Sequence, residues 1–252
     1  METLIFPTIF GTKIKAFFTG KNPGADLPRI AEIASIGMQE IFVPVQKHTD
    51  EILLLNSFEP QIGDAVITDK KGVLIGVQVA DCVPILLYDR RTGAMGAVHA
   101  GWRGTAAGIL KKTIYAMMRR FAAVQTDIVL AIGPGIRWCC YDVGLEVIDA
   151  VKTATGAGDY CRVERGKRYL DLPRANMHQA ISAGVNPDNI CMSVDCTCCM
   201  PEKYFSYRFA KGSTGRQGAF IGFVQQELFT PGSGANVCMQ GQSQLRNLLH
   251  DS

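Results

Sequence analysis

Apolar positions along the chain recur with two different periods. Short runs dominated by apolar and β-branched residues alternate with segments in which apolar side chains return at helical spacing. The short runs predict strands and the helical spacing predicts amphipathic helices, so the pattern is typical of an α/β protein. The predicted strands cover residues 41–45, 64–68, 73–79, 84–88, 94–99, 127–132, 168–172, 190–195 and 218–224.

Four helices are predicted between these strands. The first follows Asp26, a good N-cap, and stops near Gly37. Residues 100–104 form a tight loop, after which Thr105 caps a helix whose apolar face holds Ala106, Leu110, Ile114, Met117 and Phe121. The last two cover 145–155 and 174–183, with Pro173 at the first helical position.

No internal repeat or low-complexity block divides the chain. We therefore expect one catalytic domain over residues 1–230, built as a mixed β-sheet with helices packed on its faces in a layered α-β-α sandwich. From Pro231 onward the signal weakens, so residues 231–252 are expected to form a C-terminal tail.

Composition and charge restrict the class of partner. Of the 252 residues 47% are hydrophobic and 19% charged, which allows a large core and excludes disorder for most of the chain. The net charge of +3 is too small for a nucleic-acid binder. The most apolar stretch, 73–88, is interrupted by Gln78, Asp81 and Pro84, so no membrane span is expected. We expect small-molecule partners, and the sequence does not indicate an oligomeric state.

The nine cysteines favour reduced thiols, metal ligands or core packing over a disulfide framework, because no signal peptide precedes them. A cytoplasmic location is therefore expected. A second metal site or a disulfide is one interpretation of two groups of neighbouring cysteines, Cys139 with Cys140 and Cys196 with Cys198 and Cys199. Adjacent cysteines rarely satisfy one metal geometry, so buried free thiols are the favoured interpretation.

Histidine is scarce, and two of the four histidines lie at strand ends. His48, Cys82 and His99 each lie at or near the end of a predicted strand, where α/β sheets gather ligands. Their wide spacing excludes a zinc knuckle and fits a catalytic site with one open coordination position. Two imidazoles and a thiolate suit Zn²⁺, and Cu²⁺ is an alternative. The competing interpretation is core packing, since free cysteines and unpaired histidines are commonly buried.

Longer motifs resemble one family, the YfiH family. The matching segments are Ala80-Asp81-Cys82, His99-Ala100-Gly101-Trp102-Arg103-Gly104, Ile132-Gly133-Pro134, Cys139 to Gly144, Phe205 to Arg208 and Gly215-Arg216-Gln217. Members have been described as laccase-like multicopper polyphenol oxidases and as purine nucleoside phosphorylases with adenosine deaminase activity. The resemblance implies one metal, usually zinc, held by His48, Cys82 and His99. It also implies adenosine, inosine, guanosine or methylthioadenosine as substrate, together with phosphate.

Further site residues follow from this chemistry. Asp81 is the candidate proton shuttle. The alternative is that it orients a loop by hydrogen bonds, because adjacent strand residues face opposite sides of a sheet and Cys82 is the candidate metal ligand. Arg103 is the candidate phosphate ligand beside a helix N-terminus after Gly104, with a structural ion pair as the alternative. Gln46, Arg216 and Lys21 are further candidate substrate contacts. Lys21 lies where the family's usual Arg-x-Gly-Gly-Val-Ser stretch is reduced.

Three other functions remain open. A laccase-type copper oxidase normally needs many more histidines than four. A Cys-His hydrolase acting on peptidoglycan precursors would use Cys82 as nucleophile and His99 as base. The third is a non-enzymatic interaction protein.

Overall fold

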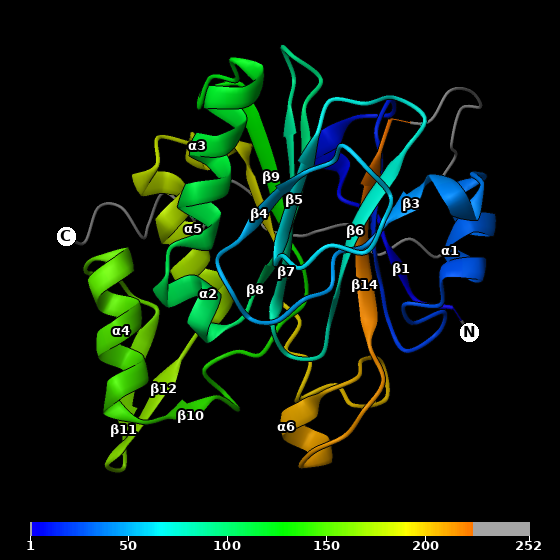
Figure 1. Ribbon diagram of the computed structural model, residues 1–252. Coiled ribbons are helices and arrows are strands. Elements are labelled where there is room, and N and C mark those ends of the chain that lie inside the picture. Colours follow the sequence, from blue (N-terminus) through cyan, green and yellow to red (C-terminus); the bar gives the residue numbers. More distant parts are fainter. Residues whose placement is uncertain (1, 224–252) are drawn as a thin grey trace.

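Two large sheets and one small sheet organise residues 2–223, the part of the chain that the computed structural model describes (Figure 1). The six-stranded sheet has the order β13 (Ile190–Met192), β9 (Ile128–Ile132), β7 (Val83–Asp89), β8 (Met95–Ala100), β5 (Ala65–Thr68), β4 (Ile52–Leu54). The five-stranded sheet has the order β1 (Leu4–Ile5), β2 (Lys15–Thr19), β14 (Gln217–Gly222), β6 (Leu74–Val79), β3 (Ile41–Phe42). The small sheet has the order β10 (Asp142–Val143), β12 (Lys167–Leu170), β11 (Cys161–Glu164).

Helices cover the outer faces of the two large sheets (Figure 1). On the six-stranded sheet lie α2 (Trp102–Ala106), α3 (Ile109–Phe121), α4 (Leu145–Thr155) and α5 (Leu172–Ser182). On the five-stranded sheet lies α1 (Leu27–Ala34), and a short helix, α6 (Tyr207–Ala210), precedes β14. Short 3₁₀ turns are formed by Thr8–Phe10, Met38–Glu40 and Pro187–Asn189.

Three buried clusters separate these layers. One lies between α2–α5 and the six-stranded sheet, a second joins the facing surfaces of the two large sheets, and a third lies under α1. Strands buried on both faces read as continuous apolar runs, as in β9, where every residue is buried. The protein is therefore a mixed α/β fold in a single domain, as predicted, but with two central sheets where we expected one.

The chain changes sheet between β6 and β7. This crossing occupies residues 80–82, in a region where the sequence shows only two successive strands. Several short strands were not predicted, among them β1, β2, β4, β10 and β11. Most of these strands are two to four residues long, and a segment this short does not show a recognisable periodic pattern of apolar residues.

The start of the helix after β8 was predicted wrongly. Helix α2 begins at Trp102 with Gly101 as its N-cap, so residues 102–104 are helical and do not form a loop. Thr105 is fully buried, and its Oγ1 accepts a hydrogen bond from Asn176 Nδ2 at 3.0 Å. Helix α2 ends with Ala107 as its C-cap, and Gly108, at φ 73°, is the N-cap of α3. The hydroxyl of Thr105 therefore bonds another helix and does not cap its own.

The other helices agree more closely with the prediction. Asp26 Oδ1 accepts the Arg29 N–H at 3.0 Å and caps α1, and α4 has the predicted bounds. Helix α5 starts two residues earlier than predicted because Asp171 caps it, accepting the Arg174 N–H at 3.0 Å. The predicted tail, 231–252, lies outside the described residues.

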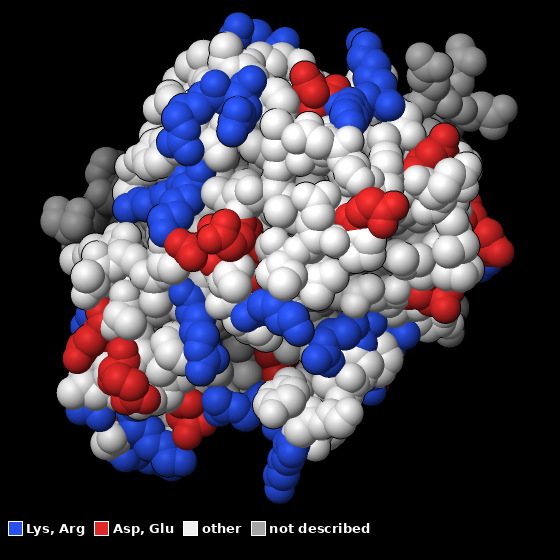
Figure 2. All heavy atoms as spheres, in the orientation of Figure 1, with Lys and Arg blue, Asp and Glu red and all other residues white. Residues whose placement is uncertain are grey.

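Charges of both signs are scattered over the face shown in Figure 2, in keeping with the net charge of +3. This face is hollowed below its centre, between the segments around α2 and α6 (Figures 1 and 2). No helix in the described part of the chain is both long and apolar enough to cross a membrane.

The close contact between the two large sheets makes a testable prediction at Gly133. A Cβ atom added to Gly133 would lie 2.5 Å from the Phe18 ring and 2.9 Å from Pro84 Cγ. We expect Gly133→Ala to lower the free energy of unfolding by about 1–3 kcal/mol, because the overpacked interface has to shift. Urea unfolding measures it. Gly96→Ala is the matched control, since its nearest neighbour is 3.4 Å away. Equal stability of both variants would contradict the packing described.

Candidate metal centre and its pocket

His48, Cys82 and His99 meet at one end of the two sheets. His48 lies in the loop after β3, Cys82 in the turn between β6 and β7, and His99 in β8. One ligand atom from each lies within 4.8 Å of the others. Cys82 Sγ is 3.8 Å from His48 Nε2, and the two imidazole rings are 4.9 Å apart and nearly perpendicular. The fold thus brings together all three residues predicted as metal ligands.

A buried carboxylate, Asp64, holds this arrangement. Its Oδ1 accepts a hydrogen bond from His99 Nδ1 at 2.7 Å, and its side chain is fully buried. The same carboxylate accepts the backbone N–H groups of Lys47, His48 and Thr49, and the Thr49 hydroxyl. Asp64 therefore connects the His48 loop to β8, and it leaves His99 Nε2 available for a ligand.

Close backbone approach is needed beside these ligands. His48 adopts φ 59°, a left-handed conformation held by the hydrogen bond from its N–H to Asp64. A Cβ atom added to Gly101 would lie only 2.9 Å from Cys82 Sγ and 3.1 Å from His48 Cδ2. Glycine at this helix N-cap thus leaves room for the ligand side chains.

The electrostatics of the metal-free group favour the thiolate form of Cys82, whereas His99 has to release a proton before it can bind a metal. Burial by itself raises the pKa of the Cys82 thiol. His48 and His99 outweigh this effect through their hydrogen bonds and positive charge, and they lower the pKa to about 6. Burial lowers the pKa of His99, and the partners Asp64 and Cys82 outweigh it and raise the pKa to about 9. Burial likewise raises the pKa of Asp64, whereas hydrogen bonds from His99 and Thr49 bring it well below its ordinary value. The cluster therefore favours a thiolate, the form of cysteine that binds a metal.

The donor set fits a zinc ion. Two imidazoles and one thiolate are ligands that zinc prefers, and three protein ligands are typical of a catalytic site with one open position. His48 is exposed, and all three residues line a pocket, so the open position faces a ligand cavity. The Asp64–His99 hydrogen bond is the carboxylate–histidine contact that commonly orients a metal-binding imidazole.

The pocket has a volume of about 480 Å³, within the range of roughly 300–1,000 Å³ found for small-molecule sites. Its wall combines aromatic rings with positive charge. Besides the three ligand residues, the lining consists of Gln78, Val79, Ala80, Asp81, Trp102, Arg103, Ile136, Tyr141, Leu172, Tyr207, Arg208 and Arg216. This composition suits a planar, polar ligand that carries or accompanies an anion.

Asp81 lines the pocket, but both of its carboxylate oxygens are engaged. Oδ1 accepts a hydrogen bond from the Thr197 hydroxyl at 2.6 Å, and Oδ2 accepts one from the backbone N–H of Arg208 at 2.7 Å. Asp81 also has φ 81°, consistent with a turn that the surrounding hydrogen bonds maintain. These contacts favour the loop-orienting alternative over the proton shuttle.

Two predicted substrate contacts lie away from the pocket lining. The Gln46 amide is bonded at both ends to the backbone of Gln78, at 2.7 and 2.8 Å, and Gln78 itself lines the pocket. The Lys21 ammonium lies over the Phe205 ring, 5.6 Å from its centroid. Gln46 therefore acts on the pocket only through Gln78.

Arg103 and Arg216 do line the pocket. The Arg103 guanidinium stacks on its neighbour Trp102 at 4.5 Å, and within residues 2–223 it forms no ion pair. Among the described residues, Arg216 donates to the nearby carbonyls of Thr214 and Gly215 and to no other group. Both guanidinium groups can therefore turn toward an anion in the pocket.

Sequence reasoning missed Asp64, Tyr141 and Arg208 as site residues. Arg208 donates to Asp142 Oδ1 at 2.6 Å and stacks on Tyr141 at 5.1 Å. Tyr141 and Arg208 both stand inside motifs that carried the family resemblance, so a signal for them existed. For Asp64, the only signal was an acidic residue at the start of an apolar strand.

Comparison with known proteins identifies the family. The family model described as multi-copper polyphenol oxidoreductase laccase matches residues 25–224. The chain belongs to this family. It is 41% identical to a Clostridium acetobutylicum protein named purine nucleoside phosphorylase, over 70% of this chain and 74% of that protein. It is 40% identical to adenosine deaminase RL5 of an unknown prokaryotic organism, over 61% of this chain and 59% of that protein.

The crystal structure of YlmD from Geobacillus stearothermophilus has the same fold. It superposes with a TM-score of 0.81 at 31% identity, covering 86% of this chain and 94% of that one. Both of these relatives bear the names of enzymes, and the family is enzymatic.

Asp64→Asn tests the support of the ligands. Loss of the carboxylate charge weakens the hold on His99 and on the His48 loop, so we expect zinc affinity to fall about 10–100-fold. Competition with a chromophoric chelator measures it. Asp50→Asn is the matched control, because Asp50 follows the same loop, is partly exposed and pairs with Lys112. Equal affinities of the two variants would show that Asp64 does not support the site.

The pKa of Cys82 makes a second prediction, for metal-free protein. Because the thiolate is the reactive form, the rate of Cys82 alkylation should follow the thiolate fraction. The rate should be half of its maximum near pH 6, fall at lower pH and reach a plateau at higher pH. Added zinc should suppress it. Peptide mapping follows each cysteine separately, and Cys198, whose pKa is raised by burial, serves as the internal comparison. A Cys82 rate that still rises at pH 9 would contradict the lowered pKa.

Proposed function

We propose that this protein is a zinc-dependent purine nucleoside phosphorylase that also deaminates adenosine. The observation that carries the proposal is one pocket in which three metal-type ligands face three arginines and a set of aromatic rings. The names of the relatives point in the same direction. Adenosine, inosine, guanosine and methylthioadenosine are the proposed nucleosides.

His48, Cys82 and His99 are the proposed zinc ligands, and Asp64 orients His99. A bound zinc ion supplies a Lewis acid and lowers the pKa of a water ligand toward about 7. The Asp64–His99 hydrogen bond keeps a proton on Nδ1, so Nε2 is the nitrogen that would bind the zinc. The thiolate form of Cys82, favoured by its lowered pKa, completes the set.

Phosphorolysis needs positive charge around the attacking anion. A phosphate oxygen attacks C1′ of the ribose, the N-glycosidic bond breaks, and the purine leaves with its electron pair and takes up a proton. Arg103 and Arg216 have no carboxylate partner within the described residues, so they are the groups we assign to phosphate. Arg208 is already paired with Asp142 and is assigned to hold the wall.

The aromatic side chains are assigned to the purine. Trp102, Tyr141 and Tyr207 line the same pocket, and flat rings of this kind stack on a nucleobase. Burial raises the pKa of Tyr141 to about 12, so its hydroxyl remains a hydrogen-bond donor at neutral pH. Stacking and one hydroxyl donor suit a base with ring nitrogens.

A copper oxidase is the less favoured alternative. The laccase mechanism uses a blue copper and a trinuclear cluster with many histidines, whereas this chain has four histidines and its site combines only two of them with one cysteine. The family's printed description supports oxidation, and the donor atoms of the site also bind copper.

A Cys-His hydrolase is a second candidate, favoured by one observation. Cys82 Sγ lies 3.8 Å from His48 Nε2, and the pKa of the thiol is lowered to about 6. His48 and His99 both contact the Cys82 thiol, so either imidazole can serve as the base, and the predicted base, His99, is the one that Asp64 orients. Rapid alkylation of Cys82 in zinc-loaded protein, together with an acyl group trapped on its sulfur, would favour this hydrolase over the phosphorylase.

Nucleoside turnover tests the proposal directly. Zinc-loaded protein should convert inosine to hypoxanthine and ribose-1-phosphate only when phosphate is present. Arg103→Ala should raise the KM for phosphate about 10–100-fold, because a charge-assisted contact contributes roughly 1.5–3 kcal/mol. Arg120→Ala, an exposed arginine on α3 outside the pocket, is the matched control and should leave the KM unchanged.

Adenosine separates the two activities. Its conversion to inosine should persist without phosphate and disappear when zinc is removed. Chromatography of the products follows both reactions. Absence of base release and of deamination, with phenol oxidation that follows added copper, would overturn the proposal in favour of the oxidase.

A further inference from the structure

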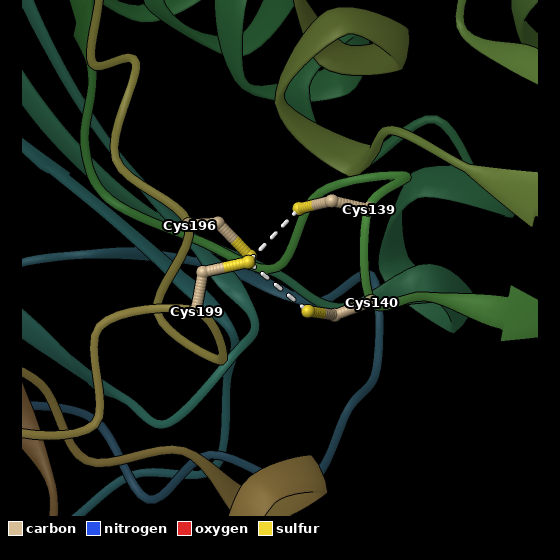
Figure 3. A group of neighbouring side chains, drawn as sticks. All are labelled: Cys139, Cys140, Cys196 and Cys199. Atoms are coloured by element: carbon tan, nitrogen blue, oxygen red, sulfur yellow. Dashed lines mark hydrogen bonds between the residues drawn. The ribbon is translucent and has the colours of Figure 1, made fainter.

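A second group of side chains, outside the pocket lining, brings four sulfur atoms together. The Sγ atoms of Cys139, Cys140, Cys196 and Cys199 all lie within 4.8 Å of one another. Cys199 Sγ is 3.3 Å from Cys139 Sγ and 3.2 Å from Cys140 Sγ. Figure 3 shows Cys139 and Cys140 pointing from one loop toward Cys196 and Cys199 on another. We refer to these four residues as the thiol cluster.

The sheet topology creates the thiol cluster. Strands β9 and β13 are parallel neighbours, so the loops that follow them leave the same edge of the sheet. Gly135 and Cys196 form an isolated parallel bridge beyond the strands, and the Thr197 N–H donates to Gly135 O at 3.2 Å. The two loops therefore continue side by side as far as the cysteines, although about 60 residues separate them in the sequence.

Further contacts hold the loop that carries Cys139 and Cys140. Arg137 is buried, forms an ion pair with Asp171 at 2.9 Å, and donates to Ser193 O at 3.0 Å. The N–H groups of Cys140 and Tyr141 both donate to Arg137 O at 3.0 Å. This tight turn lets two adjacent cysteines face the same point, which our sequence-based argument against a shared metal did not foresee.

The dimensions of the thiol cluster match a four-sulfur metal site. A tetrahedral zinc with Zn–S bonds of about 2.3 Å has S···S edges of about 3.8 Å. Two of the sulfur–sulfur distances, 3.3 Å from Cys199 to Cys139 and 3.2 Å from Cys199 to Cys140, are somewhat shorter than this edge, and all four sulfur atoms lie within 4.8 Å of one another. The group is therefore compact enough for all four sulfurs to reach one metal ion.

Disulfide pairing explains the arrangement less well. Cys199 Sγ is nearly equidistant from Cys139 and Cys140, and a disulfide can use only one of them. Such a bond would leave two free thiols beside it. The favoured interpretation from the sequence, buried free thiols, is wrong in one respect, because Cys139 and Cys199 are exposed. A surface position gives a metal ion access from solvent.

We propose that Cys139, Cys140, Cys196 and Cys199 bind one structural Zn²⁺. Each thiol releases its proton to solvent as the zinc–sulfur bond forms, and no electron is transferred. All four coordination positions are occupied by sulfur, as in closed structural sites, so this zinc has no position for substrate. It is distinct from the candidate site at His48, Cys82 and His99.

The position of this zinc links it to the pocket. Tyr141, which follows Cys140, lines the pocket, and the Cys140 carbonyl accepts Arg208 Nη1–H at 3.2 Å. Thr197, which follows Cys196, donates its hydroxyl to Asp81, the neighbour of Cys82. The zinc therefore crosslinks two loops that both contribute contacts to the pocket wall.

Metal content under reducing conditions tests the proposal. Because the pocket holds a zinc site of its own, the measurement is made in the His99→Ala background, where the thiol cluster is the remaining site. This variant should retain about one zinc per chain, and adding Cys199→Ser should remove it. Cys198→Ser in the same background is the matched control, since Cys198 lies in the same turn outside the thiol cluster and should leave the zinc in place.

X-ray absorption at the zinc edge of the unmutated protein gives a second readout that does not depend on the folding of a variant. With the thiol cluster occupied, the average zinc has more sulfur than nitrogen neighbours; with only the pocket occupied, nitrogen predominates. A nitrogen-rich average, equal zinc content in the Cys199→Ser and Cys198→Ser proteins, iron in place of zinc, or a disulfide within the cluster in intact-mass analysis would each overturn the proposal.

Discussion

The hydrogen bonds of one buried carboxylate hold the site together. Asp64 is fully buried and accepts bonds from three successive backbone N–H groups, from a threonine hydroxyl and from His99 Nδ1. These donors keep its pKa low, so the charge persists in the interior. The Asp64 carboxylate is hydrogen-bonded both to the loop that contains His48 and to the His99 ring. One side chain therefore positions two of the three candidate ligands.

The third ligand depends on the way in which the two sheets are joined. Residues 80–82 carry the chain from the five-stranded to the six-stranded sheet, and Asp81 stabilises this turn through Thr197 and Arg208. The turn thereby places Cys82 opposite the two histidines. The pocket forms where the sheets end, and side chains from both sheets and from α2 and α6 contribute to its wall.

The two sulfur-containing groups illustrate how the donor set determines a role. The pocket group combines one thiol with two imidazoles and leaves a coordination position facing a cavity, which is suited to chemistry on a bound molecule. The thiol cluster offers four sulfurs, so a metal ion bound there, as we propose, would have no open position and would be suited to crosslinking loops. Scarcity of histidine and abundance of cysteine in this chain are both consistent with that division.

The sequence by itself determined the α/β class and most long strands and helices, because apolar periodicity is a local signal. It also indicated His48, Cys82 and His99 as candidate ligands, through scarce residue types and through motifs that resemble a known family. Tertiary structure alone decided that the sheets are two, that α2 starts at Trp102, and that Asp64 and Arg208 serve the site. It also brought Cys139 and Cys140 to Cys196 and Cys199. These features depend on pairing between distant strands, such as β9 with β13, and no local pattern encodes which strands become neighbours.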